Sequence, residues 1–170
     1  MTQQRDDDVL RPLGAPIADD FLRGLPRDVV AFLDAVRHAV IATHDGDGAI
    51  WQAVVWYAVD EDGILMNSLL GRRWSENLRR DPSLSMAVFD GEDYVILRGR
   101  AVLVDEPARA MAEARALARR YGGDPDVHRG QHRLRIMFHP DHAGMHGRLA
   151  PPPDRGPARR PRPPAAHRST

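Results

Sequence analysis

Hydrophobic residues occur along this chain in short blocks that are separated by turns rich in glycine and aspartate. Six of these blocks have the length and composition of β-strands, and they span residues 38–43, 49–59, 64–68, 84–89, 94–104 and 134–138. Asp-Gly pairs lie between several of them, at residues 45–48, 60–63 and 90–93, so consecutive strands are expected to pair as antiparallel hairpins. Gly99 lies inside one of the longest blocks and predicts a bulge or bend.

Three further segments have the composition and spacing of helices, at residues 26–37, 72–80 and 107–121. Pro26 and Pro107 stand in the first turns of the first and third of them, where proline is favoured. Short strands joined by tight turns, with helices at the ends, are typical of a barrel. We therefore predict a mainly β fold, a six-stranded antiparallel closed or split β-barrel.

The two ends of the chain do not have this pattern. Residues 1–24 carry scattered acidic residues, prolines and two glycines, and predict a flexible or loosely docked arm before a barrel domain over residues 25–149. Residues 150–170 are rich in proline and arginine and predict a disordered tail. Its five arginines could touch RNA or acidic partners, but a solvated tail is the favoured interpretation, and nucleic-acid binding is not expected.

The composition narrows the classes of function. The chain has 170 residues, 24 basic and 24 acidic, so its net charge does not indicate nucleic acid or an anionic surface as a partner. It has no cysteine, which excludes disulfides and thiolate chemistry. All of the basic residues are arginine, so a bound phosphate would have to be held by arginine. No apolar run is long enough to span a membrane, and we expect a cytoplasmic protein.

Residues 64–81 carry the strongest local signal for a binding site. An apolar strand ends in a turn at Gly71, and a helix follows, with Arg72 and Arg73 at its beginning. The first N–H groups of a helix lack partners and attract anions, so this turn predicts a phosphate site with Asn67 and Ser68 as further donors. Alternatively, both arginines are solvated and paired with nearby carboxylates.

The order of these elements, with the run GRR followed by NLRRDP after a hairpin that carries Val-Trp-Tyr, resembles the pyridoxamine 5′-phosphate oxidase-like split-barrel superfamily. More narrowly, it is similar to the branch of flavin- or deazaflavin-dependent oxidoreductases that use coenzyme F420. It covers about residues 33–147. The resemblance implies a homodimer with two cofactor sites in the grooves between the barrels.

Carried over residue by residue, the resemblance implies a set of cofactor-binding positions. These are Ser68, Gly71, Arg72 and Arg73 at the phosphate, Asn77 and Leu78 holding the helix, and Val54, Val55 and Trp56 along the ring system. Trp74 stands where many relatives have a lysine. Either Arg73 substitutes for that lysine, or the tryptophan packs under the cofactor and changes the shape of the anion site.

The resemblance implies an F420-dependent oxidoreductase that transfers a hydride between the deazaflavin and a small organic substrate, without a catalytic side chain. The alternatives are an FMN-dependent oxidoreductase, or a barrel that binds flavin or haem without redox turnover.

Two further predictions concern aromatic and histidine residues. Trp56 and Tyr57 must face opposite sides of their strand, and we favour Trp56 for the cofactor groove, with a core or interface position as the alternative. His128 and His132, and the group His139, His142 and His146, are interpreted as loop histidines, and no metal site is expected. Alternatively, His142 or His146 reaches the cofactor groove of a second copy or donates a proton to the substrate.

Overall fold

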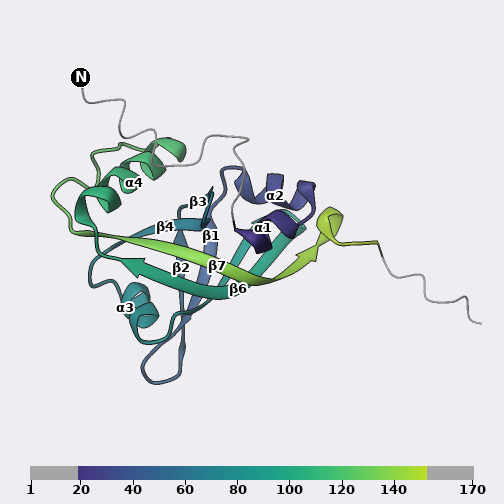
Figure 1. Cartoon of the computed structure of the whole chain (residues 1–170), viewed down its shortest axis with the longest axis horizontal. Helices are drawn as coiled ribbons and strands as arrows, with labels where there is room; N and C mark the ends of the chain where they lie inside the picture. Colours follow the sequence, from purple (N-terminus) through teal and green to yellow (C-terminus); the bar gives the residue numbers. More distant parts are fainter. Residues whose placement is uncertain (1–18, 153–170) are drawn as a thin grey trace, which may run out of the picture.

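The strands form one curled antiparallel sheet, which a computed structural model describes for residues 19–152 (Figure 1). Seven strands build it: β1 Ala39–His44, β2 Ile50–Val55, β3 Tyr57–Asp60, β4 Gly63–Leu69, β5 Ser83–Asp90, β6 Asp93–Val104 and β7 Arg133–His146. Their order in the sheet is β2-β1-β5-β6-β7-β4-β3, and every pairing is antiparallel. The mainly β, split-barrel architecture thus agrees with the prediction.

The prediction of six strands is wrong, because the predicted strand over residues 49–59 breaks at Trp56. Its first half, β2, pairs with β1, whereas its second half, β3, pairs with β4 at the other end of the sheet. The chain therefore connects the two end strands through Trp56, and this connection curls the sheet. At the break, the Tyr57 N–H donates to the Tyr121 hydroxyl at 3.1 Å, and this hydroxyl donates to the Arg37 carbonyl at 2.5 Å. A side chain thus replaces the missing ladder bond.

The inside of the curl holds the hydrophobic core. Along β1 and β5, buried and partly exposed residues alternate, as expected for strands with one face on a core. Large side chains that are less than 2% exposed meet there, among them Tyr57, Ile64, Met86, Leu97 and Phe138. The Tyr57 hydroxyl donates to the Leu33 carbonyl at 2.8 Å, which ties the second helix to the core. Tyr57 thus packs in the core and not in a groove.

Four α-helices lie around the sheet: α1 Asp20–Gly24, α2 Arg27–Asp34, α3 Arg73–Arg80 and α4 Pro107–Arg120. Figure 1 shows α3 and α4 toward the same end of the long strands β6 and β7. The last three helices agree with the predicted segments. The first corrects the prediction of a flexible arm up to residue 24, because the Asp19 side chain caps α1 and Leu22 is 1% exposed. Residues 1–18 and 153–170, which include most of the predicted tail, lie outside the described residues.

The predicted bulge at Gly99 is confirmed. The register between β6 and β7 shifts between Arg98 and Gly99, and a Cβ at Gly99 would lie 2.1 Å from the His139 carbonyl oxygen. Because the bulge accommodates the extra residue Asp141, which follows Pro140, β7 continues to His146 instead of ending at residue 138. His139, His142 and His146 are therefore strand residues, and their assignment to a loop is wrong.

No helix within residues 19–152 is long and apolar enough to cross a membrane.

Candidate functional site

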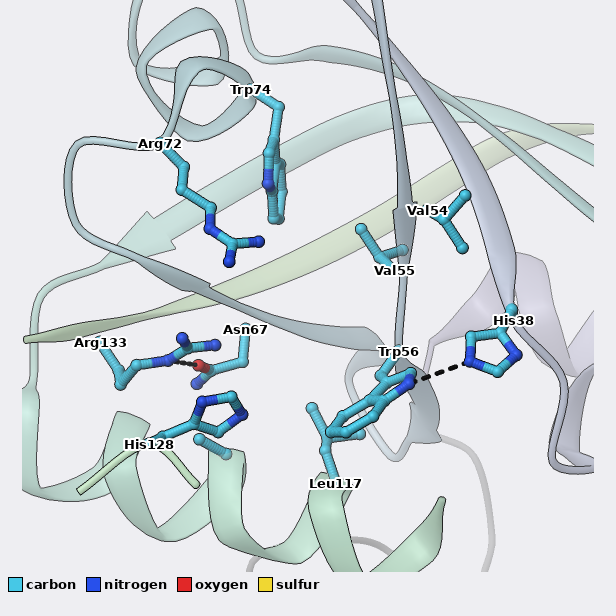
Figure 2. Close-up of a pocket in the computed structure, with 11 residues that line it drawn as sticks. His38, Val54, Val55, Trp56, Asn67, Arg72, Trp74, Leu117, His128 and Arg133 are labelled. Atoms are coloured by element: carbon cyan, nitrogen blue, oxygen red, sulfur yellow. Dashed lines mark hydrogen bonds between the residues drawn. The ribbon is translucent and has the colours of Figure 1, made fainter. Parts of the chain in front are cut away.

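A cavity of about 200 Å³ lies where the beginning of α3, the break at Trp56, helix α4 and the beginning of β7 meet (Figure 2). Its walls combine aromatic, aliphatic and basic side chains. They come from His38, Val54, Val55, Trp56, Asn67, Arg72, Trp74, Ala114, Leu117, His128 and Arg133. Six of the ten predicted site residues therefore line one cavity: Val54, Val55, Trp56, Asn67, Arg72 and Trp74.

The turn before α3 is built as the sequence predicts. Gly71 has φ of +82°, a left-handed conformation that favours glycine, and the space where its Cβ would lie is open. Arg72 occupies the N-cap position in an extended conformation, and no side chain caps the helix. The Arg72 side chain points into the cavity (Figure 2). Within residues 19–152, its guanidinium forms no ion pair, so the cationic group and the helix N-terminus both remain available to an anion.

Arg133, the first residue of β7, supplies a second guanidinium to the cavity. It is 5% exposed, and its Nε donates to Asn67 Oδ1 at 2.7 Å while its Nη1 donates to Gln131 Oε1 at 2.9 Å. Both acceptors are neutral amides. Burial, together with repulsion from Arg72, lowers the pKa of Arg133 to about 10, so it stays charged at neutral pH. The cavity therefore carries two positive charges.

Aromatic side chains form the opposite part of the cavity. The Trp56 indole stacks on Tyr121 with ring centres 5.2 Å apart, and its Nε1 donates to His38 Nε2 at 3.1 Å. His128 meets the same indole edge-on at 6.3 Å. These contacts hold the indole in one orientation, as a flat wall against which a ring system could lie. Burial, followed by the charges of Arg133 and Arg72, lowers the pKa of His128, which favours the neutral imidazole.

Trp74 occupies the position at which the family resemblance implies a lysine in many relatives. It is 4% exposed, belongs to the hydrophobic core and also lines the cavity beside Arg72 (Figure 2). The residue thus contributes an apolar wall and no positive charge. Of the two predicted possibilities, the packing of Trp74 fits a changed shape of the anion site.

Arg73 turns away from the cavity. Its guanidinium lies 4.4 Å from the Trp51 ring centre and pairs with the carboxylate of Asp45, at the tip of the β1–β2 hairpin. Arg80 also approaches Asp45, at 3.4 Å. For Arg73, therefore, the structure matches the alternative of an arginine paired with a nearby carboxylate. It does not take the place of the lysine in the cavity.

Three other predicted residues, Ser68, Asn77 and Leu78, do not line the cavity but stabilise the elements around it. Ser68 is 1% exposed, and its hydroxyl donates to the Leu69 carbonyl at 3.1 Å. Asn77, which is also 1% exposed, donates from Nδ2 to Thr43 Oγ1 at 3.1 Å and so fastens α3 to β1. Leu78 is buried in the core. Asn77 and Leu78 thus hold the helix, the role that the family resemblance implies for them.

Five lining residues escaped the prediction: His38, Ala114, Leu117, His128 and Arg133. Leu69 pairs with Arg133 across β4 and β7, and this pairing brings Arg133 beside Asn67. No local motif indicates which distant strand an arginine will join. The density of basic and histidine residues at 128–133 is the only signal that could have directed attention to this segment. Within residues 19–152, no group of His, Asp or Glu side chains is arranged to hold a metal ion.

Comparisons with known proteins agree with this fold. A family model described as pyridoxamine 5′-phosphate oxidase matches residues 25–146. Among solved structures, an F420 reductase is 23% identical, with a TM-score of 0.63, and the match covers 71% of this chain and 98% of that one.

Two further solved structures also resemble this chain in fold. A conserved hypothetical protein from Mycobacterium tuberculosis is 22% identical, with a TM-score of 0.64, over 85% of this chain and 98% of its own. The heme storage protein from Vibrio cholerae is 15% identical, with a TM-score of 0.60, over 72% and 95%. No curated protein matches the chain. At these identities, the structural likeness shows a shared fold.

Proposed function

The chain belongs to the pyridoxamine 5′-phosphate oxidase family, and on that premise we propose that it is an F420-dependent oxidoreductase whose cofactor lies in the cavity of Figure 2. It would transfer a hydride between the deazaflavin and a small organic substrate. One observation carries the proposal: Arg72, at the beginning of α3, points into an aromatic-walled cavity and has no carboxylate partner within residues 19–152.

The groups around the cavity fit a cofactor that joins a phosphate to a planar ring. The Gly71 turn and the N–H groups at the beginning of α3 are open to an oxyanion, and Arg72 can donate two parallel hydrogen bonds to it. Val54, Val55 and Trp56 offer an apolar and aromatic surface to the ring. When bound, the cofactor supplies the atom that gives or accepts the hydride.

The side chains of the cavity would position the reactants and exclude water. Trp56 is held by Tyr121 and His38, so it can keep a ring in one plane without reorganising. Trp74 and Leu117 close the cavity with apolar surface. Burial favours the neutral imidazole of His128, which can accept a proton at the rim of this surface. The hydride acceptor would thus meet an ordered and largely dry environment.

We propose further that the site is completed in a homodimer. A cavity of about 200 Å³ is smaller than the roughly 300 to 1,000 Å³ of typical ligand sites, so one chain supplies only part of the site. Beside it, the register of the sheet places Val54, Val40, Ala87 and Ile96 in one apolar row across four strands. Val54, which lines the cavity, is 67% exposed, and Ile96 is 40% exposed. A second copy would cover this row and close the cavity.

Sedimentation analysis of Ile96→Glu tests the dimer. We expect the wild type to sediment as a dimer and this variant as a monomer, because the charge would be buried against the partner. Val102→Glu is the matched control, since Val102 lies on the same strand outside the row and is 51% exposed. A monomeric wild type would contradict the proposal.

FMN is the alternative cofactor, because the phosphate turn and the Trp56 wall would fit its phosphate and ring equally well. A side-by-side fluorescence titration of cofactor-stripped protein with F420 and FMN separates the two. We expect tighter binding of F420, followed by hydride transfer from the reduced cofactor to an electron acceptor. Preference for FMN would move the protein to the flavin-dependent enzymes. Binding without turnover would make it a cofactor-binding protein, and binding of neither cofactor would contradict the proposal.

A further inference from the structure

Arg133 is a buried cation without a carboxylate partner in the described part of the chain. Its two hydrogen-bond partners, Asn67 and Gln131, are both neutral amides, and its Nη2 group makes no hydrogen bond within residues 19–152. The Nη2 atom is accessible, and Arg133 lines the cavity, so a ligand in the cavity can reach this atom. An uncompensated charge in such a place is unfavourable unless something outside the fold compensates it.

Arg135, two residues further along β7, is a buried arginine with a structural role, and its surroundings can be compared with those of Arg133. It is 8% exposed, its Nε donates to Glu113 Oε1 at 2.7 Å, and its Nη2 lies 3.6 Å from Asp60 Oδ2. Two carboxylates therefore face Arg135, whereas none within residues 19–152 pairs with Arg133. Two buried arginines with similar exposure thus have opposite electrostatic surroundings.

Asn67 holds the Arg133 guanidinium in place. Its Nδ2 donates to the Ala110 carbonyl of α4 at 2.7 Å, and its Oδ1 accepts from Arg133 Nε at 2.7 Å. Because Nε and Nη1 already donate hydrogen bonds, Nη2 is the part of the guanidinium that remains for a ligand. An arginine that is fixed before a ligand arrives loses little entropy on binding it.

We propose that Arg133, oriented by Asn67, binds an oxyanion of the molecule held in the cavity, separate from the phosphate at Arg72. This inference rests on the proposed function, because it takes the cavity to be the binding site. The oxyanion is a carboxylate or phosphate oxygen, and it belongs either to the cofactor or to an organic acid that is the substrate. Arg133 is then a specificity residue that the phosphate turn alone does not reveal.

The first test is the melting temperature of apoprotein in inorganic phosphate and in chloride at equal ionic strength. We expect phosphate to raise the melting temperature of the wild type, and Arg133→Gln to lose at least half of this rise. Arg129→Gln is the matched control: Arg129 is an exposed arginine that lies four residues before Arg133 and pairs with Asp126. In chloride, Arg133→Gln should melt at or above the wild-type temperature, because it removes an uncompensated charge. A lower melting temperature, or an unchanged phosphate effect, would overturn the proposal.

The source of the oxyanion follows from titrations with FMN, riboflavin, F420 and benzoate. If the cofactor provides it, Arg133→Gln weakens F420, which carries carboxylates besides its phosphate, about tenfold. FMN, whose single phosphate would lie at Arg72, and riboflavin, which has no phosphate, are then unchanged. If a substrate provides it, cofactor affinities stay constant and benzoate binding falls about tenfold. Wild-type affinity of the variant for all four ligands would overturn the proposal. Should the wild type bind neither FMN nor F420, the proposed function fails, while the responses to phosphate and benzoate still decide the role of Arg133.

Discussion

Arg72 and Arg73 follow one another in the chain, yet they lie in different electrostatic surroundings. Arg72 points into the aromatic cavity and has no carboxylate partner within residues 19–152. Arg73 lies over Trp51 and pairs with Asp45, whose side chain is 10% exposed. The difference arises because Arg72 is the N-cap residue and Arg73 the first helical residue, so their side chains leave the turn in different directions. Of these two consecutive arginines, Arg72 is therefore available to a ligand, whereas Arg73 is held by contacts within the fold.

The largest effect should distinguish these two arginines directly. Replacing Arg72 by alanine removes a charge-assisted contact to the phosphate, and we expect a loss of about 2 kcal/mol, or roughly 30-fold in the Kd of the cofactor. Arg73→Ala should change the Kd by less than about twofold, because an exposed ion pair contributes little. Fluorescence titration measures both values, with Arg79→Ala, an exposed arginine of the same helix, as control. Equal losses for Arg72→Ala and Arg73→Ala would remove the distinction.

A smaller effect should follow from releasing Arg73. Asp45→Asn removes the carboxylate that holds Arg73. In the wild type, the hydrogen bond from Arg73 keeps the pKa of Asp45 below its usual range. In an Arg72→Ala background, Asp45→Asn should restore about fivefold of the lost cofactor affinity, because the guanidinium of Arg73 can then turn toward the phosphate. Asp47→Asn in the same hairpin turn is the control, since Asp47 accepts a hydrogen bond from the Ala49 N–H instead of an arginine. No recovery would mean that the turn itself directs Arg73 away.

The pH dependence of cofactor affinity should reflect the protonation of His128, which lines the same cavity as Arg72. In the free protein, burial and the neighbouring arginines hold the pKa of His128 below 6.5. A bound oxyanion offsets these positive charges and raises that pKa, so binding takes up a proton and becomes tighter as the pH falls below about 7. Compared with His128→Asn, the wild type should gain about threefold in affinity between pH 7.5 and pH 5.5. The two proteins should be titrated at both pH values, and parallel profiles would exclude His128 from this linkage.

The smallest effect concerns the support of Arg73. Its guanidinium lies 4.4 Å from the centre of the Trp51 ring, a cation–π contact at a partly exposed site. Trp51→Leu should lower the free energy of unfolding by about 0.5 to 1 kcal/mol and change the cofactor Kd by less than about twofold. Chemical denaturation and the same titration provide the two values. A large loss of affinity would place Trp51, and with it the hairpin, in the binding site.

Local sequence patterns were sufficient for most of the strands and for the turn before α3. Alternating apolar residues and Asp-Gly turns indicated the hairpins, Gly99 indicated the bulge, and Gly71 indicated the left-handed turn. The break at Trp56 could not be seen in the same way. Residues on both sides of it are suitable for a strand, and only pairing with two different partners, β1 and β4, separates β2 from β3.

The site was predictable only where it consists of neighbours in sequence or of positions that the family resemblance carries over. Arg133 joins Asn67 through the pairing of β4 with β7, and His128 reaches Trp56 from the loop after α4. The direction of Arg73 depends on Asp45, which lies 28 residues earlier in a hairpin tip. Each of these contacts depends on tertiary packing, for which the local sequence contains no signal.

A crystal structure of the protein with F420 bound would test most directly whether this cavity is the cofactor site. We expect the cofactor phosphate at the Gly71 turn, in contact with the Arg72 guanidinium and the first N–H groups of α3, and the ring beside Val54, Val55 and Trp56. A phosphate held by Arg73, or a cofactor bound outside this cavity, would contradict the assignment.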